Sequence, residues 1–176
     1  MKRFFRLFSI GGCVTLLFSL LGCGGDLKNE KIAEATFDTM IECINHEDKD
    51  GLKSLFSETA IEEATDLDSE IALFFDWFDE EIITVEKHHI QLHKTYTAQG
   101  DIYRTRLYWK VYTEGHSYTL FIYQITTDEI EPKNEGVYAM QITDNELAEE
   151  WEKATGERYL YDDESHAGLL TSCDLG

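Results

Sequence analysis

Within residues 29–143 the spacing of apolar side chains changes once, and that change restricts the folds open to this chain. Up to residue 80 apolar residues recur every three or four positions, which predicts helices. From residue 82 onward they alternate, which predicts strands. Helices followed by sequential strands indicate an α+β fold, with helices packed on one face of a curved antiparallel sheet.

Three N-terminal helices are predicted before the sheet. They span Asn29 to His46, residues 48–57 and roughly Asp66 to Glu80, with a short helical turn at residues 59–64. The third helix carries a wide apolar arc, which a large surface must cover. Its four aromatic residues are Phe74, Phe75, Trp77 and Phe78.

About four strands follow the helices. They are predicted at residues 82–94, 101–114, 117–127 and 136–143. The segment TEGH between the second and third of them is typical of a tight hairpin turn.

A C-terminal helix is predicted after the strands. Asp144 stands at the position of its N-cap and Gly156 at the position of its C-cap. Leu147 and Trp151 are expected to face inward. Residues 157–176 show no strong periodicity, so an irregular tail is expected there.

The first 22 residues have the composition of a leader. Their three charged residues, Lys2, Arg3 and Arg6, are all basic, and an apolar stretch covers residues 7–21. A basic segment followed by about 7–15 apolar residues is typical of a secretory signal peptide and is too short for a membrane span.

The junction Leu20-Leu21-Gly22-Cys23 resembles the lipobox of bacterial lipoproteins. In that family the chain is cut before the cysteine, whose thiol carries a diacylglycerol. The resemblance implies a signal peptide at residues 1–22, lipidation of Cys23, and a protein anchored in the cell membrane on its extracytoplasmic side. An ordinary signal peptide with an incidental cysteine is the alternative.

Residues 23–29 then form a short lipidated tether before the domain at residues 30–156. About six residues of chain span at most ~20 Å. The domain is therefore expected to sit close to the membrane.

The order of three helices and four strands resembles the cone-shaped domains related to nuclear transport factor and ketosteroid isomerase. The leader, a helix of the kind EKIAEATFDTMIECINHEDKDGLKSLFS and a late strand EGVYAMQIT also resemble a group of uncharacterised bacterial lipoproteins with such a domain. The likeness covers about residues 30–144. It implies a pocket between sheet and helices, where the enzymes of the superfamily use an acid or an Asp–His pair to move a proton.

The charge of the chain excludes one class of partner. Without the leader, 12 of the 15 basic residues remain against 35 acidic ones, for a formal net charge of −23. Such a surface repels phosphate backbones, so no nucleic-acid partner is predicted. The acidic excess is expected to serve solubility, with an acidic working surface as the alternative.

Cysteines and histidines give no metal site. Cys43 and Cys173 could pair as a disulfide or stay separate thiols. The segment HHIQLH lies on a predicted strand, where His89 and His93 stand about 13 Å apart, too far for one ion. We predict no metal and no cofactor.

No catalytic motif is present, and no catalytic residue is predicted. Glu86 and His116 lie on ambiguous faces and are the ionisable candidates for a pocket. Aromatic residues on the strands are candidates for a pocket lining, although core packing is commoner for such residues. The lining candidates are Tyr103, Trp109, Tyr123 and Tyr138.

We therefore expect a lipid-anchored, non-catalytic domain that binds a small ligand or another envelope protein. An enzyme of the isomerase or dehydratase type, with an acid or a histidine in the pocket, is one alternative. A structural envelope protein that works through its acidic surface is another. A filled interior would favour a protein partner, whereas an acid in a closed apolar cavity would favour the enzyme.

Overall fold

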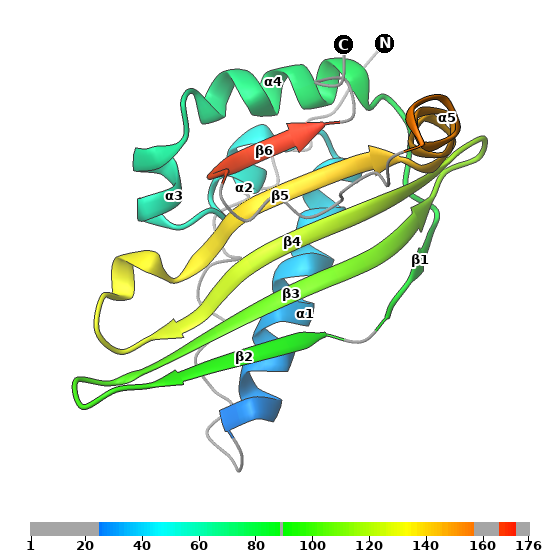
Figure 1. Ribbon diagram of the computed structural model, residues 1–176. Coiled ribbons are helices and arrows are strands. Elements are labelled where there is room, and N and C mark those ends of the chain that lie inside the picture. The colour runs from blue at the N-terminus through cyan, green and yellow to red at the C-terminus, as the bar shows by residue number, and fades with distance from the viewer. Residues whose placement is uncertain (1–24, 89, 157–165, 172–176) are drawn as a thin grey trace, which may run out of the picture.

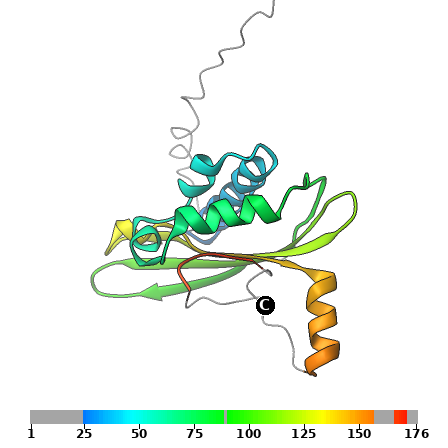
Figure 2. The ribbon, with the colours of Figure 1, turned by 90° about the horizontal axis from the view of Figure 1, so that it is seen from above.

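The computed structural model describes residues 25–88, 90–156 and 166–171. Four helices cover one face of a six-stranded sheet, as Figure 1 and Figure 2 show. A fifth helix, α5, leaves the end of the sheet toward the opposite side (Figure 2). The predicted α+β class is confirmed.

The helix layer follows the predicted order, with different bounds. α1 begins before the predicted Asn29, and a separate helix replaces the short turn at residues 59–64. The apolar stripe of α1 is buried against the sheet, because its members recur at helical spacing. The four helices are α1 (Gly25–Asn45), α2 (Lys49–Lys53), α3 (Glu58–Glu63) and α4 (Leu67–Trp77).

The sheet is mixed and open, with the strand order β1-β3-β4-β5-β6, and β2 also pairs with β3. All pairings are antiparallel except that of β5 with β6. The strands are β1 (Thr84–Glu86), β2 (Gln91–Tyr96), β3 (Asp101–Tyr112), β4 (Ser117–Asp128), β5 (Gly136–Asp144) and β6 (Gly168–Thr171).

The single strand predicted at residues 82–94 is wrong, because this segment forms β1 and β2 on the same edge of β3. Between them the backbone carbonyl of His88 accepts a hydrogen bond from the indole Nε1 of Trp109, at 3.0 Å. The pairing with β3 stops after Glu86 and resumes at Gln91, and the His88 carbonyl has a side-chain partner in this gap.

The irregular tail predicted at residues 157–176 is wrong for its described part. Gly168–Thr171 is β6, which pairs in parallel with β5. The Leu169 N–H donates to the Glu70 carboxylate of α4 at 2.9 Å. The strand has only four residues, and this partner lies 99 residues away in the sequence. The local sequence pattern therefore does not predict the strand.

Helix α5 (Asn145–Thr155) has the predicted caps. The Asp144 carboxylate accepts from two backbone N–H groups of the first turn, and Gly156 has a left-handed φ of 73°. Leu147, which was expected to face inward, is exposed, and Ala148 is buried instead. Only a narrow strip of the surface of α5, around Ala148, is therefore buried against the rest of the domain.

A cluster of buried apolar side chains lies between the helices and the sheet. Trp109 of β3 is fully buried, and its ring centroid lies 4.2 Å from that of Phe37 in α1. Other large side chains without exposed surface surround this pair. They include Met40, Leu52, Phe74, Leu107, Leu120, Ile122, Met140 and Ile142.

The loop between β4 and β5 is organised by Asp128. Its carboxylate accepts hydrogen bonds from the backbone N–H groups of Ile130 and Glu131, at 3.0 and 2.9 Å. The Asn134 amide donates to it at 2.9 Å. Burial acts to raise the pKa of Asp128, but these hydrogen bonds outweigh it and hold the pKa below its usual value.

We expect Asp128→Ala to lower the free energy of unfolding by about 2 kcal/mol at pH 7, because three donors lose a charged acceptor. The native pKa is depressed, so this contribution is present above pH ~4 and is lost as the pH falls through the folded-state pKa. Urea unfolding at pH 7 and pH 3 measures both values. Asp76→Ala, at an exposed position of α4, is the control, and an equal loss in both variants would contradict the assignment.

Candidate functional site

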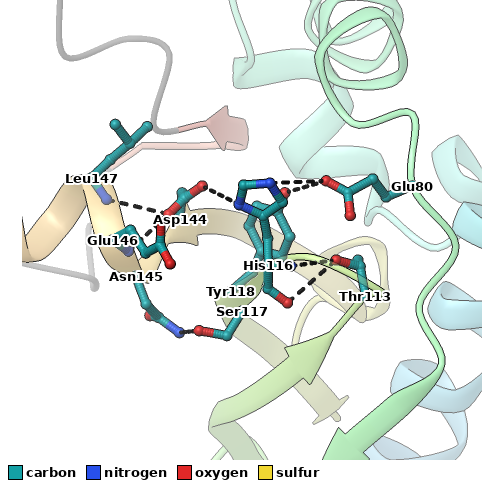
Figure 3. A network of polar contacts seen from close by, with 9 residues as sticks. All are labelled: Glu80, Thr113, His116, Ser117, Tyr118, Asp144, Asn145, Glu146 and Leu147. Carbon is teal, nitrogen blue, oxygen red and sulfur yellow. Dashed lines mark hydrogen bonds and ion pairs between the residues drawn. The ribbon is translucent and has the colours of Figure 1, made fainter.

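Four ionisable residues from three segments of the chain meet at one end of the sheet (Figure 3). We name Glu80, His116, Tyr118 and Asp144 the His116 cluster. The imidazole lies between two carboxylates: its Nε2 is 3.8 Å from Glu80 Oε1, and its Nδ1 is 3.8 Å from Asp144 Oδ2. The Tyr118 hydroxyl donates to the same Glu80 oxygen at 3.2 Å.

Local structure positions each member of the cluster. The predicted TEGH turn joins β3 to β4, and the His116 N–H donates to Thr113 Oγ1 at 3.0 Å. Asp144 ends β5, and its Oδ1 caps α5 by accepting from Glu146 N at 2.8 Å. Because one carboxylate oxygen caps the helix, the other faces His116.

Residue Asn145 ties the start of α5 to β4. Its amide donates to Ser117 Oγ at 3.0 Å and accepts from the Thr119 hydroxyl at 2.7 Å. These bonds hold Asp144 beside the hairpin turn. The position of the cluster is therefore set by β4, β5 and the first turn of α5.

The cluster lies at the molecular surface. The side chains of His116 and Glu80 are 45% and 30% exposed, whereas Asp144 is mostly buried. Tyr118 is buried against the rings of Trp77 and Phe78, whose centroids lie 5.8 and 5.0 Å from its own. A solvent-accessible imidazole thus lies beside two carboxylates. It also contacts the ring of Tyr118.

Electrostatics keep the Tyr118 phenol protonated. Burial first, and then the Glu80 carboxylate, raise the pKa of Tyr118 well above its ordinary value of 10. At neutral pH the hydroxyl is therefore a hydrogen-bond donor to Glu80.

Glu80→Gln is expected to lower the pKa of Tyr118, because the substitution removes the nearby negative charge but leaves the burial. An NMR titration of labelled tyrosine side chains measures this shift. Glu81→Gln, at the exposed neighbouring position, should leave the titration unchanged. Equal curves for Glu80→Gln and the unmodified protein would contradict the contact.

The cluster can accept a positively charged group, because its two carboxylates attract a cation. The imidazole can add a hydrogen bond through either ring nitrogen. Within the described residues no set of three His, Cys, Asp or Glu side chains has the arrangement of a metal site.

The four predicted lining residues do not come together. Trp109 belongs to the core, and Tyr103 lies on the same face of β3 near the start of α1. Tyr123 pairs with Arg106, so it lies on the opposite face of the sheet from Trp109. The Tyr138 ring is 6.0 Å from that of Tyr123, and its hydroxyl donates to Glu63 at 2.7 Å.

Of the two ionisable candidates, the structure places only His116 in the cluster. Glu86 lies on the edge strand β1, where its carboxylate accepts from the Tyr112 hydroxyl at 2.7 Å. His88 Nε2 is 3.8 Å from Glu86, and His93 contacts Arg106. His89 lies outside the described residues.

The cysteine predictions stay predictions. Cys43 is buried on α1. Cys23 and Cys173 lie outside the described residues, so neither the lipid nor the disulfide is tested. No helix in the described part of the chain is long and apolar enough to cross a membrane.

Sequence reasoning missed two members of the cluster. Glu80 was assigned to the end of a helix, and Asp144 only to a helix cap. The sequence did hint at a site role for Asp144, because a helix cap uses one carboxylate oxygen and leaves the other available. It gave no such hint for Glu80, which follows α4 in a segment without regular structure.

By architecture the molecule is an α+β domain with helices on one face of an open mixed sheet. The chain belongs to the family of the domain of unknown function DUF5104, whose model matches residues 39–146. This span includes the whole His116 cluster. A search of curated proteins found no match.

Proposed function

We propose that the protein is a lipid-anchored domain of the bacterial envelope that binds a protein partner through the His116 cluster. The observation that carries the proposal is the location of the ionisable groups. They lie at the exposed end of the sheet, whereas the interior between sheet and helices is packed around Trp109. The anchor rests on the lipobox-like junction at Cys23, and the cone-like likeness rests on element order.

The packed interior favours a binding surface over pocket chemistry. The enzymes that the element order resembles hold an acid in an apolar cavity. Here the rings of Trp109 and Phe37 pack against each other between α1 and the sheet, and both side chains are fully buried. The acids of the cluster instead face the surface beside an exposed imidazole.

The chemistry of the cluster favours a basic partner segment. Glu80 and Asp144 are suited to a lysine or arginine side chain, and Trp77 supplies a neighbouring aromatic ring. The strongly acidic chain would also steer a basic partner toward the domain at low salt. Binding should therefore weaken as the ionic strength rises.

Photo-crosslinking in intact cells tests the proposal. A benzophenone residue at Glu114, in the turn beside the cluster, should give a discrete protein adduct. The same residue at Gln99, in the turn of the other hairpin, is the matched control.

The double substitution Glu80→Gln and Asp144→Asn should reduce the Glu114 adduct while leaving the fold intact. The Asn at position 144 keeps a side-chain oxygen that can cap α5. An adduct of equal yield at both turns, or one unchanged by the double substitution, would contradict the proposal.

A further inference from the structure

The start of α1 leaves almost no tether between the domain and Cys23. The helix begins at Gly25, so Gly24 is the one residue between it and the cysteine. Two peptide units span at most about 7 Å between Cα atoms. If Cys23 carries the lipid, the first turn of α1 therefore has to lie at the membrane surface.

The residues around the start of α1 fit that location. Leu27 is 54% exposed on the first turn of the helix, and Tyr96 is 67% exposed at the end of β2. Lys94 pairs with Tyr103 across the strands and forms an ion pair with Asp26, which brings this end of β2 and β3 against α1. We name Leu27, Tyr96 and Tyr103 the α1-start surface.

These side chains are of the types found at membrane interfaces. Tyrosine is enriched there because its ring is apolar, whereas its hydroxyl is polar and stays hydrated. Lys94 lies over the Tyr103 ring, 5.6 Å from its centroid, so its ammonium group covers the aromatic face. A partly exposed aromatic and aliphatic surface thus lies beside the start of α1.

The α1-start surface is neutral in an acidic chain. Residues 26–31 hold two acids and two lysines, and residues 94–103 hold one of each, whereas the chain has a formal net charge of −20. Glu129 borders the surface, where its carboxylate accepts from the Asp101 N–H at 2.9 Å. This end therefore brings fewer uncompensated carboxylates against the headgroups than a strongly acidic face would, and so loses less hydration of charged groups on contact.

The His116 cluster lies at the other end of the sheet. Asn29 of α1 accepts a hydrogen bond from Thr127 at 2.9 Å, near the end of β4, whereas Tyr118 lies near its beginning. These two positions are nine residue steps apart, which is about 30 Å along the strand. Figure 1 shows the start of α1 and the hairpin beside α5 at opposite ends of the molecule.

We propose that the α1-start surface rests against electroneutral phospholipid headgroups and so directs the His116 cluster away from the membrane. This inference rests on the proposed lipid anchor at Cys23. The anchor limits the distance between the membrane surface and the first turn of α1. The exposed side chains of Leu27 and Tyr96 determine which face of the domain touches the headgroups.

Spin labelling of the full chain in phosphatidylcholine vesicles tests the inference. A ketone-bearing residue at position 27 or 96 takes a hydroxylamine nitroxide without involving the cysteines. Positions 73 and 83 are controls, because Leu73 and Ile83 are 65% and 62% exposed. Leu73 belongs to α4 and Ile83 directly precedes β1, and both elements lie away from the start of α1 (Figure 1). Mass spectrometry of each sample first establishes whether Cys23 carries the lipid.

With the lipid present, labels at 27 and 96 should collide several-fold less often with a water-soluble nickel complex than labels at 73 and 83. Equal accessibility at all four positions in lipidated protein would overturn the orientation and leave the anchor intact. Absence of the lipid would overturn the anchor and with it the orientation. The two failures are therefore distinguishable.

Discussion

Trp109→Ala is expected to lower the free energy of unfolding by about 3–5 kcal/mol. Trp109 has no exposed surface, and its ring packs 4.2 Å from that of Phe37. Its indole N–H also donates to the His88 carbonyl at the break between β1 and β2. The substitution therefore removes core packing, leaves a cavity, and deprives the His88 carbonyl of this hydrogen-bond donor.

Chemical denaturation with a two-state fit measures this loss. Trp77→Ala is the matched control, because Trp77 is only partly buried and should cost about 1–2 kcal/mol. If Trp109→Ala cost no more than the control, Trp109 would have the pocket-lining role for which the sequence made it a candidate. The proposed binding surface, which depends on a packed interior, would then fail.

Cys23→Ala should abolish incorporation of labelled palmitate and remove the mature protein from the lipid-anchored membrane fraction. The thiol is the one group at this junction to which a diacylglycerol can be attached, so the effect is expected to be complete. Growth with labelled palmitate, followed by purification and fractionation, measures both outcomes.

Cys13→Ala is the matched control, because Cys13 lies in the same leader ten residues before Cys23. It should keep full labelling. Labelling that survives in Cys23→Ala, or that is lost equally in both variants, would contradict a lipid on Cys23.

Features with local causes were predictable from the sequence. The apolar stripe of α1, the TEGH turn and the two caps of α5 depend on residues within a few positions of one another. Capping and amphipathic spacing leave their pattern in any single sequence. These elements were therefore located, although α1 starts earlier than expected.

Features with distant causes were not predictable. At the interruption between β1 and β2 the His88 carbonyl accepts from the indole of Trp109, and in β6 the Leu169 N–H donates to the Glu70 carboxylate. Neither partner is near in sequence to the element that it affects. A continuous strand and an irregular tail were the natural predictions without them.

The candidate site shows the same division. His116 was singled out by residue type, but its neighbours Glu80 and Asp144 come from different segments. Only the folded sheet brings the end of β5 beside the β3–β4 turn. The lining candidates failed to gather for a related reason, because Tyr123 lies on the face opposite Trp109.

Both the proposed anchor and the proposed orientation depend on the state of Cys23, which intact-mass and peptide mass spectrometry of the membrane-bound protein measure directly. We expect a chain that begins at Cys23 and carries a diacylglycerol on that residue. A membrane-bound chain whose Cys23 is unmodified, or a chain that begins at a later residue, would contradict it.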